Sequence, residues 1–90
     1  MIQLEIPAAL NRFTDEQETV PLEAGTVGEA LEELWTRFPK LRSRVLDANG
    51  EVFPYLLLFH NGHKLSRSEF KTHPLNTGDT LEIVALAEGG

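Results

Sequence analysis

Two glycines at the C-terminal end, Gly89 and Gly90, are the residues of this sequence that are best suited to take part in a reaction. Because glycine has no Cβ, a diglycine segment fits through a channel that is too narrow for other residues. A C-terminal carboxylate is ionised at neutral pH, so it can attack the α-phosphate of ATP and form an acyl-adenylate. The alternative interpretation is a frayed terminus that happens to contain glycine.

Other reactive side chains in the sequence form no convincing catalytic set. Three imidazoles with an open coordination position are typical of catalytic zinc, and the sequence has three histidines, His60, His63 and His73. No further ligand accompanies them, so we expect solvated side chains and no metal. The acidic residues at 15–18 lie in a polar segment without an apolar pocket to raise a carboxyl pKa. We therefore expect no enzyme activity from this chain alone.

Composition and charge exclude several classes of partner. The net charge is −6, which disfavours nucleic acid, because that affinity comes from Lys and Arg neutralising phosphates, and also disfavours an anionic membrane. No apolar run approaches the length of a membrane span, and the N-terminus lacks the pattern of a signal peptide. With no cysteine, the chain needs no oxidising compartment, and we expect a cytoplasmic protein.

Alternating apolar residues, and one continuous apolar run at residues 55–59, predict five short strands. These are expected at residues 2–6, 19–22, 55–60, 63–65 and 80–86. Pro21 restricts its strand to a sheet edge, because proline cannot donate to a ladder. Asn61-Gly62 predicts a tight hairpin turn. We expect irregular polar connections at residues 11–16 and 66–73.

A capped amphipathic helix is predicted over residues 26–38. Thr26 is the expected N-cap, and Glu29 is expected to complete a capping box by reaching back to it. The apolar residues recur at helical spacing and form one stripe, namely Val27, Ala30, Leu31, Leu34, Trp35 and Phe38. Pro39 should end this helix, and a short helical turn is expected over residues 41–46.

The order of these elements predicts an α+β fold in two layers, because one helix covers only one sheet face. We expect a β-grasp (ubiquitin-like) fold, a mixed sheet of four to five strands with the first and last strands paired in the middle and one main helix on one face. Residues 1–90 should form a single domain with a flexible C-terminal tail, residues 86–90. The predicted core contains Ile2, Leu4, Ile6, Val20, Leu22, Val27, Leu31, Leu34, Leu56, Leu58, Leu81 and Ile83.

Four apolar residues should point away from the helix, on the other face of the sheet. Strand alternation assigns Leu57, Phe59, Val84 and Leu86 to this face. A contiguous exposed apolar patch on a small protein usually marks a partner site, so we expect a docking surface here. The alternative is that a loop, or the side chains of Phe53 and Tyr55, covers the patch.

Several segments resemble the MoaD/ThiS family of ubiquitin-like (β-grasp) sulfur carrier proteins. The resemblance lies in the capped segment 26–31 with the exit at 38–41, in Phe59-His60-Asn61-Gly62, in residues 74–81 and in the terminal diglycine. It implies that a partner adenylates Gly90 with ATP and that a sulfur donor then forms a thiocarboxylate. Gly89 would be the adjacent residue whose lack of a side chain lets the segment enter the partner's channel. The tail departs from the family pattern in carrying Glu88 before the glycines.

The partners implied by this resemblance are an E1-like adenylating enzyme, a sulfur donor such as a cysteine desulfurase or rhodanese, and a sulfur-accepting synthase. No permanently bound cofactor is implied, because the partner uses the ATP. Cofactor, cysteine and tRNA-thiolation pathways all remain open as destinations of the sulfur. Two other hypotheses remain: a ubiquitin-like modifier conjugated through Gly90 to lysines, and a non-covalent β-grasp interaction module.

Overall fold

The structure is a computed structural model that describes residues 1–86. Its elements in chain order are β1 (Ile2–Glu5), the 3-10 helix η1 (Ala8–Phe13), β2 (Thr19–Leu22), α1 (Val27–Arg37), α2 (Pro39–Val45), β3 (Leu56–His60), β4 (His63–Lys64), the 3-10 helix η2 (Arg67–Glu69) and β5 (Thr80–Ala85). The sheet order is β2-β1-β5-β3-β4. β1 and β5 are parallel, whereas the other pairs are antiparallel. This is the predicted β-grasp arrangement, with Pro21 on the edge strand β2.

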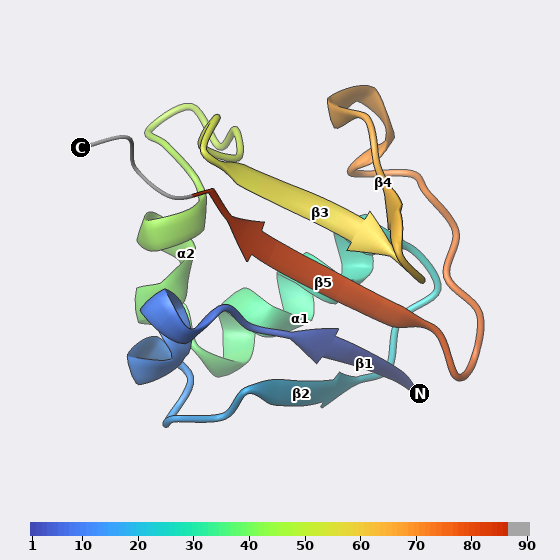
Figure 1. Cartoon of the computed structure of the whole chain (residues 1–90), viewed down its shortest axis with the longest axis horizontal. Coiled ribbons are helices and arrows are strands. Elements are labelled where there is room, and N and C mark those ends of the chain that lie inside the picture. Colours follow the sequence, from blue (N-terminus) through green and yellow to red (C-terminus); the bar gives the residue numbers. More distant parts are fainter. Residues whose placement is uncertain (87–90) are drawn as a thin grey trace.

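The core lies between the sheet and α1, which crosses one face of the sheet (Figure 1). All twelve residues of the predicted core are buried, as is Trp35 on the helix stripe. The opposite sheet face carries no helix within residues 1–86. No helix in this part of the chain is long and apolar enough to span a membrane.

The N-terminus of α1 is capped as predicted by one side chain but differently by the other. The Thr26 hydroxyl accepts a hydrogen bond from the backbone N–H of Glu29 (3.1 Å). The Glu29 carboxylate accepts from the N–H of Gly25 (2.8 Å) rather than from that of the cap residue itself. The prediction of a reciprocal capping box was therefore wrong in its second bond, because Glu29 reaches one residue further back and binds the N–H of Gly25.

Three connections are more regular than the sequence predicted. Pro39 ends α1 but also occupies the first turn of α2, where its missing N–H costs nothing. The segment 11–16 begins inside the 3-10 helix η1. The segment 66–73 contains η2, which has a full capping box between Ser66 and Glu69, and its Phe70 is buried.

The segment after η2 docks directly on the first turn of α1. The backbone N–H of Val27 donates to the carbonyl of His73 (2.9 Å), and that of Gly28 donates to the carbonyl of Lys71 (3.3 Å). These bonds satisfy two of the helix donors that have no partner within the helix. A Cβ at Gly28 would lie 2.6 Å from the Lys71 carbonyl oxygen, so the close approach requires glycine.

Arg67 fixes the other side of the same segment. Its guanidinium donates to the backbone carbonyls of Val52 (2.7 Å), Phe53 (3.1 Å) and Leu56 (3.1 Å). Three carbonyls that precede or begin β3 are thereby held by one planar donor group. Arg67 thus joins η2 to the start of the strand that carries half of the predicted docking surface.

Candidate functional site

The C-terminal segment of the chain is described as far as Leu86, which follows the central strand β5. β5 pairs with β1 on one side and β3 on the other, and just past it the N–H of Leu86 donates to the carbonyl of Tyr55 (2.8 Å). The root of the segment is therefore fixed to two central strands and to the start of β3. Gly89, Gly90 and the rest of the predicted tail beyond Leu86 lie outside the described residues.

The predicted docking residues gather on the sheet face opposite α1. Leu57 and Val84 are direct cross-strand partners, and Phe59 lies one pleat further along β3. These three side chains are half-buried, whereas Leu86 is 48% exposed. We call these four residues, Leu57, Phe59, Val84 and Leu86, the docking patch. Phe53 and Tyr55, which the alternative interpretation places over the patch, stack on one another with ring centroids 5.4 Å apart.

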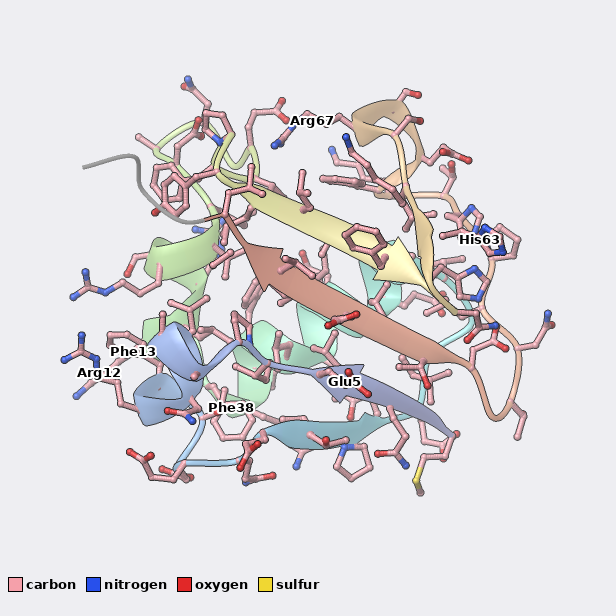
Figure 2. All side chains as sticks on the ribbon, viewed as in Figure 1. Glu5, Arg12, Phe13, Phe38, His63 and Arg67 are labelled. Carbon is pink, nitrogen blue, oxygen red and sulfur yellow. The ribbon has the colours of Figure 1, made fainter. Side chains whose placement is uncertain are left out.

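Acidic residues border the docking patch on one side. Glu82 lies opposite Phe59 across one ladder and beside Glu5 of β1 across the other. Glu5 is exposed on this face (Figure 2). With Glu18, these carboxylates contribute to a hollow of about 450 Å³ over β1 and β5 that reaches Val84. The face thus joins an apolar half on β3 and β5 to an acidic half on β1 and β5.

Two of the three histidines are not simply solvated, which corrects the expectation from the sequence. His60 Nδ1 lies 2.9 Å from His73 Nε2, and His60 Nε2 lies 2.7 Å from Asp79 Oδ2. His73 Nδ1 lies 3.6 Å from Glu69 Oε2. Only His63 is exposed, on the hairpin strand β4 (Figure 2). Residues 1–86 contain no group of three or more His, Asp or Glu side chains arranged to hold a metal ion.

Hydrogen bonds to the charged form lower the pKa of Asp79 to about 2. The largest cause is the backbone N–H of Asn76 (2.8 Å), followed by His60 and by the Asn61 side-chain amide (3.1 Å). The pKa of Glu69 is also lowered, first by the backbone and side chain of Ser66. The cluster thus joins the β3–β4 hairpin to the corner that leads into β5.

A second hollow, of about 320 Å³, lies on the helix side of the molecule. Its lining includes Leu31 and Trp35 of α1, together with Val52, Arg67 and Phe70. This hollow could not be predicted from the sequence, because its walls come from three segments that are distant in the chain. Its floor consists of residues that also complete the hydrophobic core.

The strand order and the helix on one face define a class, the small β-grasp proteins. Similar solved structures include SAMP1 from Haloferax volcanii, at 26% identity over 99% of this chain and 98% of that chain, with a TM-score of 0.84. A chain of the Amycolatopsis orientalis BexX/CysO complex matches at 21% identity over 100% of both chains, with a TM-score of 0.87. Urm1 from Trypanosoma brucei matches at 20% identity over 99% of this chain and 94% of that chain, with a TM-score of 0.73. The last two likenesses concern the fold alone.

The family follows from the sequence match. The model of the ThiS family matches residues 4–90, nearly the whole chain, and a search of curated proteins found no match. The chain belongs to the ThiS family. This confirms the resemblance that the helix, hairpin, corner and diglycine segments indicated.

Proposed function

We propose that this chain is a cytoplasmic sulfur carrier whose Gly90 is adenylated by an ATP-dependent activating enzyme and then converted to a thiocarboxylate. The observation that carries this proposal is the ThiS family match, which extends through both terminal glycines. Gly90 is the activated residue in this proposal, and Gly89 is the neighbour whose lack of a Cβ lets the segment thread into the partner.

The proposed chemistry takes place at one carboxylate. An oxygen of the Gly90 carboxylate attacks the α-phosphorus of ATP and pyrophosphate leaves. The outer sulfur of a persulfide on the donor then attacks the acyl carbon and AMP leaves. A thiol cleaves the S–S bond of the resulting acyl disulfide and is itself oxidised to a disulfide with the donor, which leaves the thiocarboxylate on Gly90. The partner supplies ATP and the catalytic groups, whereas this chain presents the acyl group on a segment rooted at Leu86.

The docking patch has a role in this proposal as the surface that the activating enzyme recognises. Leu57 and Val84 are cross-strand neighbours, and Leu86 continues the surface to the root of the C-terminal segment. Burial of apolar area gives about 25 cal/mol per Å², so the patch can contribute binding energy close to the reacting end. The carboxylates of Glu5 and Glu82 beside it favour a partner with basic residues at the matching position.

The partners in this proposal are an E1-like adenylating enzyme, a sulfur donor such as a cysteine desulfurase or rhodanese, and a synthase that accepts the sulfur. CysO of Amycolatopsis orientalis has been solved in a complex with BexX, which supports the general expectation of a protein partner for a chain of this fold. The destination of the sulfur, in cofactor, cysteine or tRNA-thiolation biosynthesis, is open in this proposal.

A second candidate function is a ubiquitin-like modifier joined through Gly90 to lysines of other proteins. It is favoured by the likeness to SAMP1 of Haloferax volcanii, which is described as a small archaeal modifier protein. Both functions begin with the same acyl-adenylate. They differ in the product, because a carrier accumulates as a free thiocarboxylate and a modifier as conjugates of higher mass.

The test uses the full chain with ATP, the activating enzyme of the same organism, a sulfur donor and a thiol reductant. Intact mass should rise by the difference between sulfur and oxygen, and fragmentation should place this gain on Gly90. Fragmentation is needed because oxidation of Met1 gives nearly the same shift. The same spectrum checks that Gly90 carries the C-terminal carboxylate.

Variants of the terminal residues sharpen the test. Deletion of Gly90 moves the carboxylate out of reach, and Gly89→Leu adds bulk where the channel should admit none, so both should prevent charging. Glu88→Gln keeps both glycines and serves as the control that should still be charged. Charging of the deletion variant, or no modification of Gly90 under any condition, would contradict the carrier proposal and favour a non-covalent interaction module.

A further inference from the structure

Positive charge is concentrated at one end of this acidic protein. The chain has a net charge of −6 and eight Lys and Arg residues. Four of these lie on η1 and on the neighbouring helix α2, which packs against it. We call these four exposed residues, Arg12, Lys40, Arg42 and Arg44, the basic end.

One aromatic ring holds two of these arginines together. The guanidinium carbon of Arg12 lies 5.3 Å from the centroid of the Phe13 ring, and that of Arg44 lies 4.9 Å from it. Figure 2 shows Arg12 and Phe13 at the end of the molecule formed by η1 and α2. Stacking on a ring restricts a long side chain, so these guanidinium groups lose less freedom when they bind a ligand.

The charges of the basic end are not neutralised within the described part of the chain. Ion pairs within 4.0 Å in residues 1–86 include Arg37 with Glu33 but none of the four residues of the basic end. A position near the C-terminus of a helix suits basic side chains electrostatically. That effect accounts for Arg42 and Arg44 within α2, but it does not bring Arg12 of η1 onto the same ring as Arg44.

The basic end is connected to the root of the C-terminal segment by three contacts. The carbonyl of Val45, next to Arg44, accepts from the N–H of Phe53 (3.0 Å). The Phe53 ring stacks on Tyr55, whose carbonyl accepts from the N–H of Leu86 (2.8 Å). Figure 1 shows α2 and η1 at the end of the sheet toward which β5 runs. The basic end therefore has a defined position relative to Leu86, the last described residue.

We propose that the basic end binds an acidic surface on the activating enzyme, as a contact separate from the docking patch. This proposal rests on the proposed function. Guanidinium groups bind carboxylates in a planar, bidentate geometry. A nucleic-acid ligand is disfavoured, because Asp15, Glu16 and Glu18 follow η1 directly and would repel a phosphate backbone that extends beyond the four basic residues. Complementary charge at this end would orient the C-terminal segment as the two proteins meet.

The first experiment measures carboxylate binding without any enzyme. The full chain is titrated with a hexaglutamate peptide at low salt, and backbone amide shifts are followed by NMR. The shifts should concentrate at residues 12–13 and 40–45, and they should weaken at high salt, since the Debye length falls to about 3 Å at 1 M. Shifts of equal size around Lys64 and Lys71 would overturn the proposal.

The second experiment measures pyrophosphate exchange by the activating enzyme at varied concentrations of the carrier. Arg12→Glu and Arg44→Glu should each raise the KM by about threefold to tenfold. Lys71→Glu is the matched control, because it reverses one exposed charge outside the basic end, and it should change the KM by less than about twofold. Arg42 does not stack on Phe13, so Arg42→Glu provides a further charge reversal if the Arg12 and Arg44 variants fail to fold.

The outcomes separate this inference from the proposed function. Equal KM values for Arg44→Glu and Lys71→Glu, with normal adenylation of the wild type, overturn the inference and leave the carrier function intact. If the wild type is not adenylated at all, the carrier function fails. The hexaglutamate titration then still decides the inference, because localised shifts support an acidic ligand and evenly spread shifts contradict it.

Discussion

His60 at the end of β3 contacts His73, with Nδ1 of the first 2.9 Å from Nε2 of the second. Only one proton can lie between two such nitrogens, so one ring donates and the other accepts. The Asp79 carboxylate can only accept, so His60 donates to it from Nε2 (2.7 Å). In the neutral form of His60, Nδ1 is then the acceptor from His73. The pair thereby ties the β3–β4 hairpin to the segment that approaches β5 and to the corner that begins it.

The first prediction concerns acid stability and Asp79. Its pKa is lowered from 3.8 to about 2 in the folded protein, so the ionised carboxylate stabilises the fold. This contribution is present above the unfolded pKa and is lost as the pH falls through the folded value. The urea midpoint of the wild type should therefore drop between about pH 4 and pH 2, and Asp79→Asn should show a smaller drop from a lower starting point.

The control for this prediction is Glu32→Gln. Glu32 is exposed on α1 and forms no ion pair within residues 1–86. Its difference from the wild type should stay nearly constant over the same pH range. A difference between Asp79→Asn and the wild type that does not change with pH would mean that the carboxylate contributes no pH-dependent stability.

The second prediction concerns the close approach at Gly28. Alanine is the better helix former by about 1 kcal/mol, but its Cβ would lie 2.6 Å from the carbonyl oxygen of Lys71. Because that neighbour is backbone, the segment must shift, and overpacking of this kind costs about 1–3 kcal/mol. Gly28→Ala should therefore lower the free energy of unfolding, measured in urea.

Gly25→Ala is the matched glycine for this comparison. The nearest atom to its added Cβ is Glu29 Oε1 at 3.4 Å, the end of a flexible side chain. We expect a change within about 0.5 kcal/mol there. Equal stability of Gly28→Ala and the wild type would show that the segment after η2 adjusts without cost.

The strands and the main helix could be predicted from sequence because their patterns are local. Alternation assigned Leu57 and Val84 to the outer face, and helical spacing assigned Leu34 to the core. The histidine cluster could not be predicted in this way, since His60 lies 13 residues from His73 and 19 residues from Asp79. Contacts between such distant residues depend on the path of the connections.

Two other features depended on tertiary structure for the same reason. The neighbouring carboxylates of Glu5 and Glu82 follow from the parallel register of the first and last strands. The shared ring of Phe13 joins Arg12 to Arg44, and no short pattern in the sequence connects these two arginines. Sequence reasoning therefore predicted the apolar half of the candidate face but missed the charged groups around it.

The third prediction concerns the core beneath the sheet. Leu34 is fully buried on α1, and removal of a buried leucine side chain costs about 2–5 kcal/mol. Leu34→Ala should show this loss in urea unfolding. Glu32→Ala, at an exposed position of the same helix, should stay within about 0.5 kcal/mol, and a similarly small change at Leu34 would contradict the packing of the stripe.

The last prediction concerns the docking patch and depends on the proposed carrier function. Phe59→Lys places a charge among Leu57, Val84 and Leu86, so a partner that buries this patch would have to desolvate an ammonium group. Adenylation by the activating enzyme should be abolished. Thermal stability should change little, because Phe59 is only half-buried and its cross-strand partner Glu82 can pair with the new charge.

Gln3→Lys is the control for this variant. Gln3 is exposed on β1 and alternates with the buried residues Ile2 and Leu4, so its side chain lies on the outer sheet face. The variant therefore adds the same charge to the same face, outside the docking patch. Adenylation of Gln3→Lys should remain close to that of the wild type. Unimpaired adenylation of Phe59→Lys would remove the docking role, whereas equal loss in both variants would mean that the enzyme rejects positive charge anywhere on this face.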